Sequence, residues 1–161
     1  MRVGVISDTH DNASNVARIV AVLREARVER VIHTGDITRV STLRMLAEIA
    51  VPVFGVFGNN DRERAALAEA AAELGFELAE PPLELRWAGR RITVVHDRRA
   101  HPELELGARD VLLHGHDHRY ALERIDGTLV FNPGECAGWL EGRNSVGVLD
   151  LVRLDADVLR F

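Results

Sequence analysis

Seven side chains that can bind a metal ion lie at or just beyond the ends of short apolar runs in this chain. They are Asp8, His10, Asp36, Asn59, His96, His116 and His118. In an open α/β sheet, functional side chains collect at the carboxyl ends of the strands, so residues far apart in the sequence can meet there. The pattern therefore favours an α/β fold in which all seven side chains face one pocket.

The apolar runs have the character of buried strands. They span residues 2–7, 30–34, 51–58, 92–96 and 110–115, are short, and are rich in β-branched residues or leucine. Apolar residues with the spacing of one buried helix face follow each of the first three runs. These are Val16, Ile19, Val20 and Leu23, then Leu43, Leu46, Ala47 and Ala50, then Leu67, Ala70, Ala71 and Leu74. The first half of the chain is therefore predicted to alternate strands and helices.

After Gly75 the predicted strands are joined by turns instead of helices. Residues 83–87 and 91–95 flank one turn, residues 120–125 and 128–131 flank Asp126-Gly127, and residues 146–151 and 156–161 close the chain. Asp-Gly between alternating runs is a strong hairpin signal, because both turn residues must tolerate positive φ. We expect a mainly antiparallel second half and an α/β fold of two mostly mixed sheets, packed face to face as a sandwich with helices outside. One mixed sheet is the alternative.

Length and composition fit a single domain over residues 1–161. The chain has 161 residues, of which 47% are hydrophobic and 28% charged, enough to bury roughly two-thirds of the surface of the unfolded chain. No apolar run approaches the ~20 residues that a membrane helix requires. The N-terminus enters a predicted strand without a signal-peptide core, so we expect a cytoplasmic protein with no membrane partner.

Charge and cysteine content disfavour other kinds of site. The formal net charge is -5 and every basic residue is an arginine, but the arginines are spread along the chain, unlike the dense basic patch of a nucleic-acid binder. Cys136 is the only cysteine, which excludes an intramolecular disulfide and a thiolate cluster. An acidic protein that handles phosphate needs local positive charge, which bound divalent cations would supply.

The donor types indicate which metals the site would take. Asp8 and His10 are two apart in an extended segment and share a face, and Gly35 lets the backbone at Asp36 approach a metal closely. A carboxylate can bridge two cations, and this mixture of oxygen and imidazole nitrogen suits Mn, Fe, Zn, Co or Ni and disfavours Ca. Seven donors with one shared carboxylate give four ligands to each of two metals, leaving a position for water or a substrate oxygen.

In chain order the candidate ligands form the motifs Asp8-Thr9-His10, Gly35-Asp36, Gly58-Asn59-Asn60-Asp61, His96 and Gly115-His116-Asp117-His118. This series resembles the calcineurin-like metallophosphoesterases, and Asn132-Pro133-Gly134 resembles a loop of their small YfcE-type phosphodiesterases. The resemblance implies two divalent ions per chain, Mn in first place. It assigns Asp8, His10, Asp36 and His118 to metal one, and Asp36, Asn59, His96 and His116 to metal two.

The implied reaction is hydrolysis of a phosphoester. Two metals ~3.5 to 4 Å apart lower the pKa of a shared water, and the resulting hydroxide attacks the phosphorus directly. Many relatives carry a histidine where this chain has Asn60, and asparagine cannot act as a general acid at neutral pH. We therefore expect slow turnover, with a preference for small phosphodiesters, of aryl or nucleotide type, or for monoesters with acidic leaving groups.

Residues around the motifs have alternative roles. Asn60 fits a helix cap, with Glu63 three residues later, or a contact to substrate. Asp61 is a candidate to orient a ligand, and Asp36, Asn60 and Asp61 are the candidate catalytic residues. Arg39 and Arg98 are candidate phosphate ligands, although solvated surface charges are the favoured account of both.

The other candidate residues are expected to be structural. Asp11-Asn12 would hold His10 in place or cap the first helix. His33 and His114 would be hydrogen-bonded beneath the metals, and His101 would lie on the surface. Trp139 and Leu140 would form either a local packing contact or the interface of a homo-oligomer.

The same residues are compatible with two other functions. Retromer subunits resemble the same fold but act as interaction scaffolds that have lost a metal-site histidine, whereas this chain keeps every ligand position. The same chemistry would also serve a nuclease or a cyclic-nucleotide phosphodiesterase, although the sequence contains neither a basic groove nor an evident aromatic platform. A small phosphoester is therefore the expected substrate, and nucleic acid is disfavoured.

Overall fold

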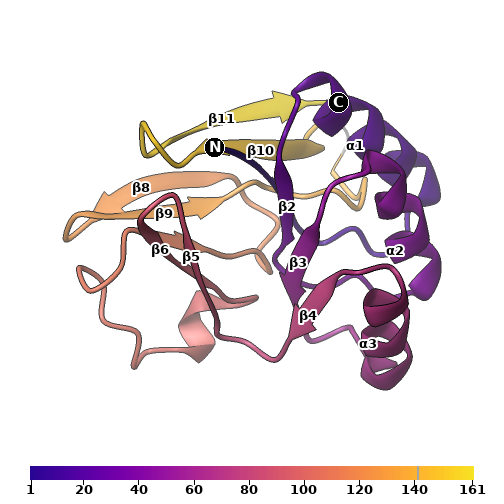
Figure 1. The fold of residues 1–161 in the computed structure, drawn as a ribbon, viewed down its shortest axis with the longest axis horizontal. Helices are drawn as coiled ribbons and strands as arrows, with labels where there is room; N and C mark the ends of the chain where they lie inside the picture. Colours follow the sequence, from indigo (N-terminus) through magenta and orange to yellow (C-terminus); the bar gives the residue numbers. More distant parts are fainter. Residues whose placement is uncertain (141) are drawn as a thin grey trace.

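Two β-sheets face each other, and the helices cover the outer side of one of them (Figure 1). The computed structural model describes residues 1–140 and 142–161. The first sheet contains β1 (Arg2–Ile6), β2 (Arg30–His33), β3 (Val53–Val56), β4 (Glu77–Ala79), β10 (Ser145–Asp150) and β11 (Asp155–Arg160). The second contains β5 (Leu83–Trp87), β6 (Arg90–Val94), β7 (Val111–Leu113), β8 (Ala121–Ile125) and β9 (Thr128–Asn132). The predicted sandwich of two mixed sheets is confirmed.

The two sheets contain both parallel and antiparallel strand pairs. The first sheet runs β11-β10-β1-β2-β3-β4 and the second β5-β6-β7-β9-β8. Strands β1 to β4 are parallel and are linked by helices, whereas β10 pairs antiparallel with both β1 and β11. In the second sheet β7 is parallel to both of its neighbours. The second half of the chain thus contributes to both sheets.

The predicted hairpins are present. The β8–β9 hairpin turns at Asp126 and Gly127, with φ of 49° and 83°, and the β5–β6 hairpin turns at Ala88 and Gly89, with φ of 49° and 75°. Strand β4, which has three residues and lies at the edge of the first sheet, was not predicted. No helix in the described residues is long and apolar enough to cross a membrane.

In the part of the chain that the structure describes, three α-helices pack on the first sheet. They are α1 (Ala13–Glu25), α2 (Val40–Leu46) followed by the 3₁₀ turn η1 (Ala47–Ile49), and α3 (Arg64–Glu73). The predicted apolar face of α1 is buried, as are Leu67, Ala70 and Ala71 of α3. The prediction for the second helix was wrong at its end: Ala50 is exposed with a φ of 62°, because the helix tightens into η1 and buries Ile49 instead.

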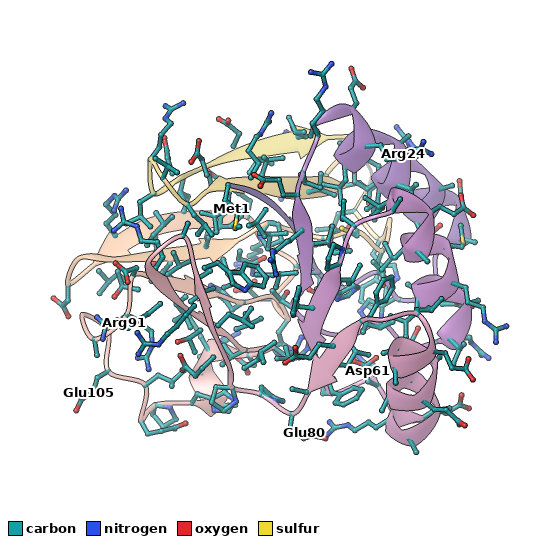
Figure 2. All side chains as sticks on the ribbon, viewed as in Figure 1. Met1, Arg24, Asp61, Glu80, Arg91 and Glu105 are labelled. Carbon is teal, nitrogen blue, oxygen red and sulfur yellow. The ribbon has the colours of Figure 1, made fainter. Side chains whose placement is uncertain are left out.

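Side chains from both sheets fill the space between them (Figure 2). Val5 and Ile32 of the first sheet and Leu113 and Phe131 of the second are among the fully buried members of this core. Burying an aliphatic or phenylalanine side chain contributes roughly 1.5 to 3 kcal/mol. The core therefore fixes the two sheets relative to each other, and with them the ends of their strands.

Candidate metal centre

The seven predicted ligands come together where the carboxyl ends of the two sheets meet. Asp8 and His10 follow β1, Asp36 follows β2, and Asn59 follows β3 of the first sheet. His96 follows β6, and His116 and His118 follow β7 of the second sheet. Donor atoms from both sheets therefore share one site.

One group of donors surrounds Asp8 and His10. The Nε2 atom of His10 lies 3.4 Å from Oδ2 of Asp36 and 3.9 Å from Oδ1 of Asp8. The Nε2 atom of His118 lies 3.5 Å from the same Asp8 oxygen. Four donors bonded to one cation at ~2.1 Å lie about 3 to 3.5 Å apart, so this spacing suits a shared metal.

A second group shares Asp36 with the first. The Nε2 atom of His96 lies 3.5 Å from Oδ2 of Asp36 and 2.9 Å from Oδ1 of Asn59. Nδ1 of His116 lies 3.0 Å from that Asn59 oxygen and 3.2 Å from Nε2 of His96. Oδ2 of Asp36 is thus close to donors of both groups.

The backbone at this site is strained to aim the donors. Asp8, His10, Asp36, His116 and His118 all have positive φ, between 41° and 72°. Each non-glycine residue in this region costs about 1 to 2 kcal/mol, and such strain gathers at functional sites. Two glycines make room: a Cβ at Gly58 would collide with the Asp36 carboxylate, and one at Gly115 would collide with Ser7.

Residues 1–153 match the profile of the calcineurin-like phosphoesterase superfamily domain. The chain belongs to this superfamily. It is therefore a phosphoric ester hydrolase of a family that uses divalent metal ions, which agrees with the donors described above.

Named relatives agree with this membership. A phosphodiesterase of Methanocaldococcus jannaschii is 30% identical over 93% of both chains. The structure of an archaeal phosphodiesterase superimposes with a TM-score of 0.92 at 27% identity and 100% coverage of both chains. Vps29 of Entamoeba histolytica shares the fold, with a TM-score of 0.70 at 19% identity over 100% of this chain and 99% of that one.

In this phosphoesterase, the second ring nitrogen of two candidate ligands is hydrogen-bonded, and that of a third lies near a carboxylate. Nδ1 of His96 lies 2.9 Å from the carbonyl oxygen of Thr34, and Nδ1 of His118 lies 3.0 Å from Oε2 of Glu135. Nε2 of His116 lies 3.6 Å from Oδ2 of Asp97. Such partners fix the tautomer and the orientation of a metal-binding imidazole. Glu135 was not predicted as part of the site, because no motif distinguishes an acid after Asn-Pro-Gly from an ordinary loop residue.

Asn60 and Asp61 support Asp36 in different ways. Asn60 donates two hydrogen bonds of 2.8 Å to the Asp36 carboxylate, from its backbone and its side-chain nitrogen. The predicted helix cap at Asn60 was wrong: α3 begins at Arg64, after Glu63. The buried Asp61 accepts hydrogen bonds from the backbone amides of Gly58, Asp36 and Thr38, and so holds the loop that carries Asp36.

The pKa values of the two buried carboxylates shift in opposite directions. Burial raises the pKa of Asp36, but hydrogen bonds from His96 and Asn60 outweigh burial and leave its pKa well below the ordinary value. Burial raises the pKa of Asp8, and the hydrogen bond from Ser7 and the nearby His118 offset this only in part. A bound cation would favour the ionised form of Asp8.

Two buried donor atoms aim into the site without a hydrogen-bond partner among the described residues. They are Oδ1 of Asp8 and Nε2 of His10. A buried polar atom left unpaired costs roughly 1 to 3 kcal/mol, and a cation between these atoms would satisfy both. The residues therefore fit the divalent ions that the family uses.

The remaining predicted residues divide between the site and its surroundings. Arg39 pairs with Asp11, Nε to Oδ2 at 3.2 Å, and lines a cavity of about 350 Å³ together with His10 and Asn60. Arg98 instead pairs with Glu123 at 3.5 Å and lines a different cavity. Asn12 caps α1 through a hydrogen bond from the amide of Asn15.

Two further histidines lie beneath the site. Thr9 and the Gly35 amide are hydrogen-bonded to the fully buried His33. Burial lowers the pKa of His33 to about 3, so its ring is neutral. His114 is also buried, with Asn132 close to its Nδ1 atom. Both positions agree with a structural role.

Proposed function

We propose that this chain is a two-metal phosphodiesterase that hydrolyses small phosphodiesters of aryl or nucleotide type. The observation that carries the proposal is the Asp36 carboxylate, which lies within 3.5 Å of both His10 and His96 and so joins two groups of donors. Asp8, His10, Asp36 and His118 would hold one cation, and Asp36, Asn59, His96 and His116 the other. Manganese is the preferred metal, since mixed oxygen and imidazole donors suit it, with Ni, Co, Fe or Zn as alternatives.

When bound, the two cations would acidify a water between them and neutralise the charge of the phosphoryl group. The side chains do the rest. Asn60 and Arg39 line the cavity beside His10, where an amide and a guanidinium would donate hydrogen bonds to phosphoryl oxygens. Neither group releases a proton near neutral pH, so the substrate needs a leaving group that departs as an anion.

The test is hydrolysis of bis(p-nitrophenyl) phosphate by protein loaded with Mn. Wild type should be active, and Asp36→Ala or His116→Ala should lower kcat/KM by at least about a hundred-fold, because each removes a donor from the metal centre. His101→Ala is the matched control, since His101 contacts Glu103 outside the site. Activity that survives both site substitutions would refute the proposal.

A non-catalytic scaffold is the second candidate, because Vps29 has the same fold. The complete set of seven donors favours the enzyme, since a scaffold has no need for strained residues that aim donors at one point. If the protein binds two Mn ions but hydrolyses no diester, the scaffold becomes the better account. Single-stranded RNA and cyclic nucleotides, assayed beside the aryl diester, would test the nuclease and cyclic-nucleotide alternatives.

A further inference from the structure

A second cavity lies beside the metal centre and shares one residue with it. Its volume is about 970 Å³, and His118, a candidate ligand of the first metal, forms part of its wall. Arg119, Tyr120, Gly134, Arg143, Ser145, Val158 and Arg160 complete the lining. These residues come from the loop after β7, the loop after β9, and strands β10 and β11. The cavity therefore adjoins the site at His118 and is distinct from the one that Arg39 and Asn60 line.

The lining is strongly basic in a protein that is acidic overall. Three arginines, Arg119, Arg143 and Arg160, line the cavity, and no carboxylate lies among the described residues of its lining. Within residues 1–140 and 142–161, none of the three guanidinium groups forms a salt bridge. The formal net charge of the chain is -5, so this local excess of positive charge is not a property of the surface as a whole. Clustered guanidinium groups favour an anion that accepts several hydrogen bonds, which phosphate does.

The shape of the cavity suits a group larger than a free ion. Tyr120 is 51% exposed, and its ring packs edge-on against Phe131 with the centroids 6.4 Å apart, which holds the ring in position. Gly134 presents no side chain, and a Cβ there would meet the Ser145 hydroxyl at 2.5 Å. Ligand sites for small molecules typically have volumes of about 300 to 1,000 Å³. The space therefore accommodates a phosphorylated sugar or a similar fragment.

We propose that this cavity, the Arg119 pocket, binds a second phosphate group of the substrate while the scissile diester lies at the metals. The inference rests on the proposed function and narrows it: the preferred substrates carry two phosphates, one in the reacting diester and one on the part that reaches past His118. The Arg119 pocket selects for this second phosphate and takes no part in breaking the ester bond.

Binding tests the pocket without any hydrolysis. Metal-free protein is titrated with inorganic pyrophosphate by calorimetry, beside Arg119→Gln, Arg143→Gln and Arg160→Gln. Loss of one charged hydrogen bond should weaken binding roughly ten-fold in each variant. Arg86→Gln, on the exposed side of β5 at the far edge of the second sheet, should bind as wild type does. Absence of binding to wild type, or equal binding to all variants, overturns the proposal.

Kinetics test the substrate class. Thymidine 5′-(p-nitrophenyl phosphate) and its 3′-phosphorylated form have the same leaving group and differ only in the second phosphate. Mn-loaded wild type should prefer the phosphorylated ester by roughly ten-fold in kcat/KM, and the preference should shrink in the three pocket variants but not in Arg86→Gln. Equal kcat/KM for the two esters overturns the assignment of substrate class.

The two proposals fail separately. Hydrolysis of bis(p-nitrophenyl) phosphate without pyrophosphate binding would refute the role of the Arg119 pocket but support the phosphodiesterase activity. If pyrophosphate binding depends on the three arginines but no diester is hydrolysed, the phosphodiesterase activity is refuted and the anion site is supported. Melting temperatures of all variants show whether a loss reflects unfolding.

Discussion

The indole ring of Trp139 lies parallel to the imidazole ring of His118, with ring centroids 4.6 Å apart and an angle of 12° between the planes. The same indole stacks on His10 at 4.3 Å. Trp139 is nevertheless 64% exposed. The indole therefore forms local packing contacts with two candidate ligands of the first metal, while the rest of the side chain is exposed to solvent.

Removing the indole should weaken the first metal site. An aromatic pair contributes about 0.5 to 1.5 kcal/mol, so Trp139→Ala should lower Mn affinity by roughly two- to ten-fold, and Trp139→Phe by less. Calorimetric Mn titration of the three proteins measures this effect. Equal affinity in all three would mean that the stack does not position His10 and His118.

Glu135→Gln should impair the same site more strongly. Glu135 is fully buried and its carboxylate accepts from Nδ1 of His118 and from the amide of Leu140. Replacing a partner that orients a ligand typically costs ten- to a hundred-fold in metal affinity, so we expect a loss of about that size. Glu105→Gln is the control, because Glu105 lies on the surface (Figure 2). A Glu135 variant that binds metal as the control does would contradict this role.

Metal should stabilise the fold. A ligand that binds only the folded state at a hundred times its Kd raises the free energy of unfolding by about 2.7 kcal/mol. Excess Mn should therefore raise Tm, and a chelator should reverse the change. The increase should be lost in Asp36→Ala but retained in His101→Ala. A Tm that does not respond to Mn would count against the metal centre itself.

The leaving group should limit turnover. Because Asn60 cannot protonate a departing alkoxide, wild type should hydrolyse aryl diesters and prefer those with acidic leaving groups. Asn60→His should raise the rate for a poor leaving group by at least about ten-fold, since general acids contribute this much or more. Asn60→Ala should not. A wild-type enzyme that preferred an alkyl monoester to every aryl diester would overturn the argument.

Cys136 should make stability fall at alkaline pH. Burial raises the pKa of its thiol from 9.0 to about 12, so above pH 9 the unfolded chain loses a proton that the folded chain keeps. The contribution of the protonated Cys136 thiol to the free energy of unfolding is fully present below pH 9. It is lost as pH rises towards 12, by up to about 1.4 kcal/mol per pH unit. Urea unfolding of wild type and Cys136→Ala at several pH values should show their difference narrowing. A constant difference would indicate an ordinary thiol.

Much of the fold was predictable because hydrophobic periodicity and turn chemistry agree with the tertiary structure. The Asp126-Gly127 hairpin and the buried face of α1 are examples. Strand β4 was missed because its three residues are exposed or half-buried and show no alternation. The cap at Asn60 failed for another reason: its side chain bonds Asp36, 24 residues away, and local capping signals carry no information on such a partner.

The supporting residues of the site were the hardest to foresee. A ligand motif identifies the first donors, but the partner of His118 lies 17 residues further along the chain. That contact depends on how the loop after β9 folds back, which no local spacing specifies. Supporting residues such as Glu135 can therefore be recognised only in the three-dimensional structure.

Each of the two donor groups draws on both sheets, the first through His118 and the second through His96 and His116. A cation in either position would tie the N-terminal half of the chain to the C-terminal half at a single point. If the chain were cut between β4 and β5, neither fragment would contain all the ligands of either metal. Binding of Mn by ligands from both fragments would then favour their reassembly. The ions would then hold the two halves of the fold together in addition to their part in catalysis.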